Sequence, residues 1–200
     1  VRTWFLREAE ALAQLDHPAV RHVYDTGVVG PLAYRVGNWI EGENLSEAMA
    51  RGPRPLPAVM GLARDLLGGL EHAHSQGIVV RRIVPAALLV NLSGRGTITE
   101  LRFSSYTLSA VPPGEVPSGL QFMAPEIRDG ASGDPASDIY AAGALVYFAL
   151  TGQEPPLDSA AIRPPSELRP NCPQAVERIL MRALQAEAGE RYLSAQEMHE

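Results

Sequence analysis

The sequence predicts an α+β fold in which a small part with helix and strand precedes a mostly helical part. Helical periodicity runs through much of the chain, whereas residues 20–29 and 32–40 form two strand-like runs separated by Gly30-Pro31, a pattern typical of a β-hairpin. The longest apolar run, Ile139 to Leu150, would span about 18 Å as a helix. It is too short for a bilayer and indicates a buried core helix.

The composition is that of an ordinary globular domain. Of the 200 residues, 46% are hydrophobic and 20% are charged, so the chain can bury a core and is not expected to be disordered. Acidic residues outnumber basic residues by 23 to 17, which gives a net charge of −6. This balance argues against a surface dedicated to nucleic acid or to anionic membranes, and we expect neither as a partner.

The basic residues and the cysteine content narrow the chemistry further. All 17 basic residues are arginine, so no reaction in this stretch can use a lysine amine. Cys172 is the single cysteine, which excludes an internal disulfide and a multi-cysteine metal site and fits a reducing, cytoplasmic interior. The chain opens with neither an initiator Met nor a signal peptide, and we expect it to be part of a longer protein.

The first part is expected to hold one helix and the hairpin. Residues 3–15 carry apolar side chains at helical spacing. Asp16-His17-Pro18 should end this helix, because the residue before a proline disfavours the α conformation. The two hairpin strands follow directly.

The second part begins near residue 41 and is dominated by helices. Asn44 is a suitable N-cap for a short helix over residues 45–50. A long amphipathic helix is predicted over residues 57–75, ending at Gln76-Gly77. The remaining predicted elements are strands over 87–91 and 97–101, a loop over 103–123 rich in Ser, Pro and Gly, and helices over 135–151, near 173–186 and from 194 onward.

Six motifs occur in a fixed order along the chain. They are Phe5-Leu6-Arg7-Glu8-Ala9, Leu15-Asp16-His17-Pro18, His74-Ser75-Gln76-Gly77-Ile78-Val79, Phe122-Met123-Ala124-Pro125-Glu126, Asp138-Ile139-Tyr140 with Gly143 and Leu150-Thr151-Gly152, and Glu190-Arg191-Tyr192. With these motifs the sequence resembles a protein kinase, most of all the bacterial serine/threonine kinases, from Arg2 to its end.

The resemblance implies how the chain is divided. Residues 1–40 would be a remnant of the kinase small lobe, namely one helix and the hairpin after it, without the earlier strands. Residues 41–200 would be the mostly helical large lobe, with a loop like the kinase activation segment over about residues 100–126.

The resemblance also implies roles for residues that hold the lobes together. Glu8 occupies the ion-pair position of the small-lobe helix, and Arg81 keeps the position that grips a phosphate on the activation loop. Asp138 would brace the backbone of the catalytic loop from beneath. Glu126 would form a buried ion pair with Arg191, and breaking such a pair costs roughly 3–5 kcal/mol.

The catalytic loop departs from the kinase pattern at its chemical positions. Kinases carry H-R-D-x-K-P-x-N there, and this chain carries residues 80–87, VRRIVPAA, with Pro85 holding the register. Arg82 therefore replaces the catalytic Asp, and a guanidinium cannot accept a proton. Val84 replaces the Lys that steadies the transferred phosphate, and Ala87 replaces the Asn that binds one Mg²⁺.

The metal-binding D-F-G motif is altered as well. Glu100 keeps a carboxylate that would hold a metal only loosely, and Arg102 adds bulk and charge where the motif has Gly. Gly119 stands where kinases have the Thr that contacts the catalytic Asp and Lys. With Arg82, these altered positions carry a net charge of +1 instead of −1, and we expect Mg²⁺ to bind poorly.

For the nucleotide pocket the sequence allows two interpretations. The alignment places Asn38, Trp39 and Ile40 at the hinge, where backbone groups hold adenine in kinases, and Leu89 beneath the adenine ring. Gly37 falls at the gatekeeper position, which would open the pocket behind it. Two alternatives remain open here: a pocket that binds ATP weakly, and a pocket filled by other side chains.

We interpret the sequence as a pseudokinase, a kinase-shaped module that recognises a protein partner or regulates another domain. Loss of a general base alone typically costs 10²–10⁴ in rate, and loss of a charge-stabilising group about 10²–10³. The alternative is a divergent but active serine/threonine kinase or nucleotidyl-transferase that uses Glu100 for metal. A third interpretation is a scaffold whose pocket is closed to ligands.

Overall fold

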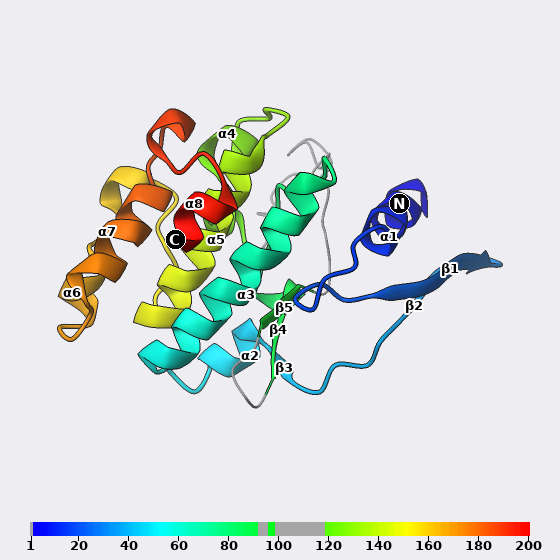
Figure 1. Cartoon of the computed structure of the whole chain (residues 1–200), viewed down its shortest axis with the longest axis horizontal. Coiled ribbons are helices and arrows are strands. Elements are labelled where there is room, and N and C mark those ends of the chain that lie inside the picture. Colours follow the sequence, from blue (N-terminus) through cyan, green and yellow to red (C-terminus); the bar gives the residue numbers. More distant parts are fainter. Residues whose placement is uncertain (1, 92–95, 99–118) are drawn as a thin grey trace.

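A computed structural model describes residues 2–91, 96–98 and 119–200. The chain forms two parts, which Figure 1 shows side by side: α1 with the β1–β2 hairpin at one end, and a helical body built around α3 and α5. Strands and helices are thus combined as the α+β prediction requires. None of the described helices has the length and apolar character that crossing a membrane needs.

The N-terminal part packs one helix against one face of a two-stranded sheet. In the antiparallel register, Val29 lies opposite Leu32 and Thr26 opposite Arg35. The side chains of β2 alternate, so that Arg35 turns toward α1 and stands over the Phe5 ring at 5.7 Å, whereas Leu32 is 70% exposed on the other face. The elements are α1 (Arg2–Ala13), β1 (Val23–Val29) and β2 (Leu32–Gly37).

A second, three-stranded sheet joins the two parts. Its strands run antiparallel in the order β3-β4-β5. The connection between α1 and β1 is tied to β5, because Val20 bridges Ile98 and the Arg21 N–H donates to the Ile98 carbonyl at 2.8 Å. The elements of this region are β3 (Glu43–Asn44), α2 (Leu45–Met49), α3 (Leu56–Ser75), the 3₁₀ turn Pro85–Ala87, β4 (Leu88–Val90) and β5 (Gly96–Ile98).

The rest of the body is helical and surrounds α5. This helix is buried on nearly every side, which explains why its sequence is apolar throughout instead of amphipathic. Asp134 caps its first turn with a reciprocal capping box to Ser137, and Gly152 ends it in the left-handed conformation. The elements are α4 (Pro125–Arg128), α5 (Pro135–Thr151), α6 (Pro165–Leu168), α7 (Gln174–Ala183), α8 (Ala195–His199) and the 3₁₀ turns Leu120–Phe122, Ser159–Ala161 and Ala188–Glu190.

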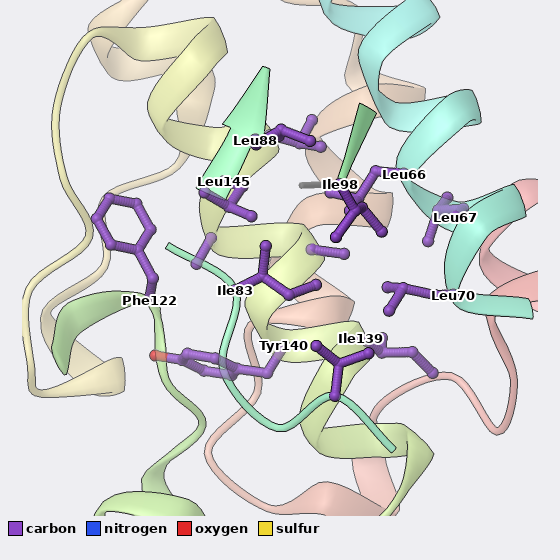
Figure 2. Close-up of a cluster of buried hydrophobic side chains, with 14 of the residues drawn as sticks. Leu66, Leu67, Leu70, Ile83, Leu88, Ile98, Phe122, Ile139, Tyr140 and Leu145 are labelled. Atoms are coloured by element: carbon purple, nitrogen blue, oxygen red, sulfur yellow. The ribbon is translucent and has the colours of Figure 1, made fainter. Parts of the chain in front are cut away.

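The hydrophobic core lies where α3, α5 and the second sheet meet. Figure 2 shows Leu66 and Leu70 of α3 facing Ile139 and Leu145 of α5, with Ile83 between the two helices. All five side chains are completely buried. Full burial of an aliphatic side chain contributes about 1.5–3 kcal/mol, so this cluster stabilises the body.

The observed elements differ from the predicted ones mainly at their ends. The first helix stops at Ala13 instead of residue 15, and the second hairpin strand stops at Gly37 instead of residue 40. Strand β3 and the helices α4 and α6 were not predicted, because two to four residues are too few to display a period. Of the predicted strand over 97–101 and loop over 103–123, only residues 97, 98 and 119–123 are described.

Candidate functional site

The predicted catalytic loop, residues 80–87, is held in place from beneath by the first turn of α5. The fully buried carboxylate of Asp138 accepts hydrogen bonds from the backbone N–H groups of Val80, at 2.8 Å, and Arg81. It also contacts His74 Nε2 at 2.8 Å. One side chain of α5 thus positions both the loop and the end of α3.

Arg81 adopts an unusual backbone conformation within this loop. Its φ of +64° is the only positive value at a non-glycine residue among the described residues. Such a conformation costs about 1–3 kcal/mol and persists only where the surroundings enforce it. Here the hydrogen bond from the Arg81 N–H to Asp138 supplies that constraint. The side chain is half-buried, and its Cγ lies beside Gly133, in the loop that precedes α5.

Arg82, at the position predicted for the catalytic base, is buried. It is only 8% exposed, and its backbone N–H donates to the Val80 carbonyl at 2.7 Å. An arginine stays protonated at every pH relevant to a folded protein. The position therefore carries a positive charge inside the loop and offers no acceptor for the proton of a substrate hydroxyl.

Val84 and Gly119 pack directly against each other. A Cβ placed on Gly119 would lie 2.7 Å from Val84 Cγ1, closer than two carbon atoms can approach. Gly119 also has a φ of +82°, in the left-handed region that favours glycine. The positions predicted for a phosphate-binding Lys and its Thr partner therefore form an apolar contact between the catalytic loop and the Leu120–Phe122 turn.

Ala87 and Leu89 follow this contact. Ala87 is 1% exposed and ends the 3₁₀ turn, with its N–H donating to the Val84 carbonyl at 2.8 Å. Its methyl group offers no oxygen to a metal ion. Leu89 is half-buried in β4, paired with Asn44 on one side and Thr97 on the other.

The residues predicted for the hinge lie between β2 and β3. The Asn38 side chain accepts from the His22 N–H at 3.0 Å, and the Asn38 N–H donates to the His22 carbonyl at 3.2 Å. Trp39 is 87% exposed, and Ile40 is half-buried. Gly37 does not face open space, because a Cβ there would lie 2.7 Å from the His22 carbonyl oxygen and 3.4 Å from Arg21 Cδ. The gatekeeper position of Gly37 and the two alternatives for the pocket stay predictions.

Glu126 and Arg191 join the end of the activation-segment region to the C-terminal helices. Arg191 Nη1 and Nη2 donate to the two carboxylate oxygens of Glu126 at 2.7 and 2.9 Å. Burial opposes ionisation of Glu126, but the bonds from Arg191, its own backbone and Ser137 outweigh it and hold the pKa of Glu126 below its ordinary value. The pair is therefore ionised at neutral pH.

Three of these contacts were not foreseen from the sequence. They are the bond from Ser137 Oγ to Glu126 at 2.9 Å, the His74–Asp138 contact and the packing of Val84 on Gly119. The sequence contained a signal for the contact between Val84 and Gly119. Both residues have apolar or no side chains where kinases have Lys and Thr.

Several predicted site residues lie outside the described part. The structure does not describe Glu100, Arg102 or most of the activation-segment-like loop. It does not describe the side chain of Glu8 in α1 either. Among the described residues, no group of three His, Cys, Asp or Glu side chains is placed to hold a metal ion. The side chains of Arg82 and Ala87 supply no oxygen ligand for Mg²⁺.

Comparison with known proteins gives consistent matches over most of the chain. The family model described as the protein kinase domain matches residues 2–190. The chain is 30% identical over 210 residues to the serine/threonine-protein kinase PrkC of Bacillus subtilis (strain 168), covering 97% of this chain and 32% of PrkC. It is 38% identical over 161 residues to the serine/threonine-protein kinase PknL of Mycobacterium tuberculosis (strain ATCC 25618 / H37Rv), covering 76% of this chain and 39% of PknL.

The structural match has the same character. The crystal structure of the Mycobacterium tuberculosis PknI kinase domain superposes with a TM-score of 0.77 at 27% identity, covering 99% of this chain and 76% of that one. The chain thus spans a third to two-fifths of the length of the two curated relatives and about three-quarters of a solved kinase domain.

Proposed function

The chain belongs to the protein kinase family, and on that premise we propose that this member is a pseudokinase, a kinase-shaped module that recognises a protein partner or regulates another domain. The family match and the PknI superposition confirm the predicted kinase-like fold and the resemblance to bacterial serine/threonine kinases. The loss of phosphate transfer is the part that we propose.

The buried Arg82 carries the proposal. Phosphate transfer needs a group that accepts the proton of the attacking hydroxyl and cations that absorb the phosphate charge. A guanidinium accepts no proton, and it offers no oxygen atom to the metal ion that would accompany the phosphates. An active site here would therefore need both a proton acceptor and a metal ligand from other residues.

The contact between Val84 and Gly119 supports the same conclusion. Val84 stands at the position of the phosphate-binding Lys, and Gly119 stands at the position of its Thr partner. The two form an apolar contact, so a reacting phosphate would meet methyl groups there. Meanwhile Asp138 and the Glu126–Arg191 pair keep the framework intact. The contacts that hold the kinase fold are present, whereas the catalytic residues are replaced. This combination supports a role in binding a partner and not in transferring phosphate.

A phosphate-transfer assay tests the proposal. The full-length protein is incubated with radiolabelled ATP, Mg²⁺ or Mn²⁺ and a generic basic protein substrate, beside its Glu100→Ala variant. We expect no incorporation above background in either protein. Metal-dependent autophosphorylation that Glu100→Ala abolishes would instead establish an active, divergent enzyme.

Thermal unfolding with ATP separates a nucleotide-binding module from a closed scaffold. A ligand at 100 times its dissociation constant adds about 2.7 kcal/mol to the free energy of unfolding. We expect any stabilisation by ATP to be the same with Mg²⁺ and with a chelator, because the described loop residues supply no metal ligand. Stabilisation by ATP would establish a nucleotide-binding module, its absence would indicate the closed scaffold, and a dependence on Mg²⁺ would show that the altered loop still admits a metal ion.

A further inference from the structure

The connection between α1 and β1 fastens the N-terminal part to the helical body. Besides the contacts of Val20 and Arg21 with β5, the Ala19 carbonyl accepts from the Ile98 N–H at 2.8 Å. The connection lies on α3 where two adjacent glycines leave room: a Cβ on Gly69 would lie 3.4 Å from Val20 Cγ2, and one on Gly68 would lie 3.4 Å from His17 Cε1. Figure 1 shows this connection crossing from the N-terminal part to α3.

His17 is a second side chain of this connection that contacts α3. Its ring stacks on that of His72 with centroids 5.6 Å apart and planes inclined by 23°. Its Nδ1 accepts a hydrogen bond from the Ala19 N–H at 3.1 Å, which closes the turn around Pro18. A ring nitrogen that accepts a hydrogen bond carries no proton, so this geometry requires the neutral form of His17.

Protonation of His17 would disturb both contacts. A proton on Nδ1 removes the acceptor of the Ala19 N–H, and it places a positive charge against the ring of His72. The charged groups facing His17 are Asp65 and Glu71, both on α3, and they favour the imidazolium. Burial and the proximity of His72 outweigh them, so the pKa of His17 lies below its ordinary value.

We propose that the stacked pair of His17 and His72 is a proton-sensitive contact that releases the α1–β1 connection from α3 as the pH falls. The sign follows from linkage: the docked state binds the proton of His17 less well than the released state does, so acidification favours release. Docking is complete above the ordinary histidine pKa of about 6.5 and weakens below it. This inference does not depend on whether the chain transfers phosphate.

Hydrogen exchange of the Ala19 amide, read by NMR on the whole chain at pH 7.5 and pH 5.5, tests the proposal. After correction for intrinsic exchange, we expect opening to increase about fivefold at the lower pH, equivalent to one lost hydrogen bond. In His17→Asn the side-chain oxygen can still accept from the Ala19 N–H but cannot titrate, and opening should not change with pH. His199→Gln, at an exposed histidine of α8, should keep the full response.

Two results would overturn the proposal. The first is a pH response that persists in His17→Asn. The second needs no variant: in the unaltered protein, the His17 ring resonances and the Ala19 amide should titrate together with a midpoint below 6.5, whereas a midpoint at or above 6.5 contradicts the inference.

Discussion

Arg191 illustrates how this domain tolerates a buried charge. The residue is 1% exposed, and each of its five N–H groups has an acceptor: the two oxygens of Glu126 and the carbonyls of Ala136, Gln185 and Ala186. Its guanidinium also faces the Tyr140 ring at 5.0 Å. Because no donor is left over, the cost of removing the charge from water is offset locally, and the pair can specify how two distant segments meet.

Removal of the Glu126 charge should therefore be costly. We expect Glu126→Gln to lower the free energy of unfolding in urea by about 2–4 kcal/mol, because a buried guanidinium loses its counter-ion. Glu167→Gln is the matched control: its partner Arg163 lies on the surface, and the change should stay within about 0.5 kcal/mol. Equal effects of the two substitutions would show that burial does not strengthen the Glu126 pair.

The same carboxylate should make stability depend on pH. Since folding lowers the pKa of Glu126, its contribution is complete above the ordinary glutamate value of 4.5 and is lost as the pH falls from there through the lowered pKa of the folded state. Glu126→Gln should remove part of this acid sensitivity. An unchanged acid profile in the variant would assign the loss of stability to other groups.

Gly119 carries a second residue-scale prediction. Gly119→Ala adds both the cost of the left-handed conformation and the collision with Val84, and we expect a loss of about 2–4 kcal/mol in urea unfolding. Gly130→Ala, whose φ is +93° and whose Cβ would meet nothing within 4 Å, should lose only about 1 kcal/mol. Val84→Ala should then cost less in the Gly119→Ala background than alone, and additive effects would contradict the contact.

Among the elements, α5 organises the body. It presents Asp138 to the catalytic loop from its first turn, Tyr140 to Arg191 and Gly143 to α7. These three residues belong to one helix. The helix therefore fixes how the catalytic loop, the Glu126–Arg191 pair and the C-terminal helices lie relative to one another. The almost uniform burial of α5 follows from this central position.

Gly143 sets the distance between α5 and α7. A Cβ there would lie 2.9 Å from the Ala183 Cβ, so the two helices approach as closely as a glycine allows. Alanine normally favours a helix by about 1 kcal/mol over glycine, but we expect Gly143→Ala to destabilise by about 1–2 kcal/mol in thermal or urea unfolding. Gly189→Ala, at a site open to solvent, should change stability little, and a gain at Gly143 would disprove the tight approach.

At the scale of the whole molecule, the two parts differ in how well they are buried. The body has a continuous core, whereas the outer face of the β1–β2 hairpin exposes apolar side chains, among them Val29 at 67% and Tyr34 at 40%. A two-stranded sheet of this kind has little stability of its own. The hairpin therefore depends on its packing against α1 and on the connection that is anchored at β5 and α3.

This difference should be visible in native-state hydrogen exchange. We expect the amides shared by β1 and β2 to exchange through local opening, at a lower free energy than the amides in the middle of α3 and α5, which should need global unfolding. Mass spectrometry of peptides covering Val23–Gly37 and Ile139–Leu150 makes the comparison. Equal protection of both peptides would show that the chain opens as one unit.

Much of this architecture was predictable because it is written in local patterns. The helix over Leu56–Ser75, the Asn44 cap and the hairpin at Gly30-Pro31 each follow from spacing and turn chemistry within a few residues. The β3 strand and the α4 and α6 helices were missed because packing, not periodicity, creates elements of that length.

The candidate site likewise has features that the sequence predicts and features that only the tertiary structure shows. The identity of its chemical groups follows from the sequence alone, since the side chain of Arg82 cannot be a base and the side chain of Ala87 cannot bind a metal ion in any fold. Only the tertiary structure decided that Arg82 is buried, that Val84 closes against Gly119, and that His17 stacks on His72. Such contacts join residues tens of positions apart, and no local pattern encodes them, because they arise only when separate elements pack around one core.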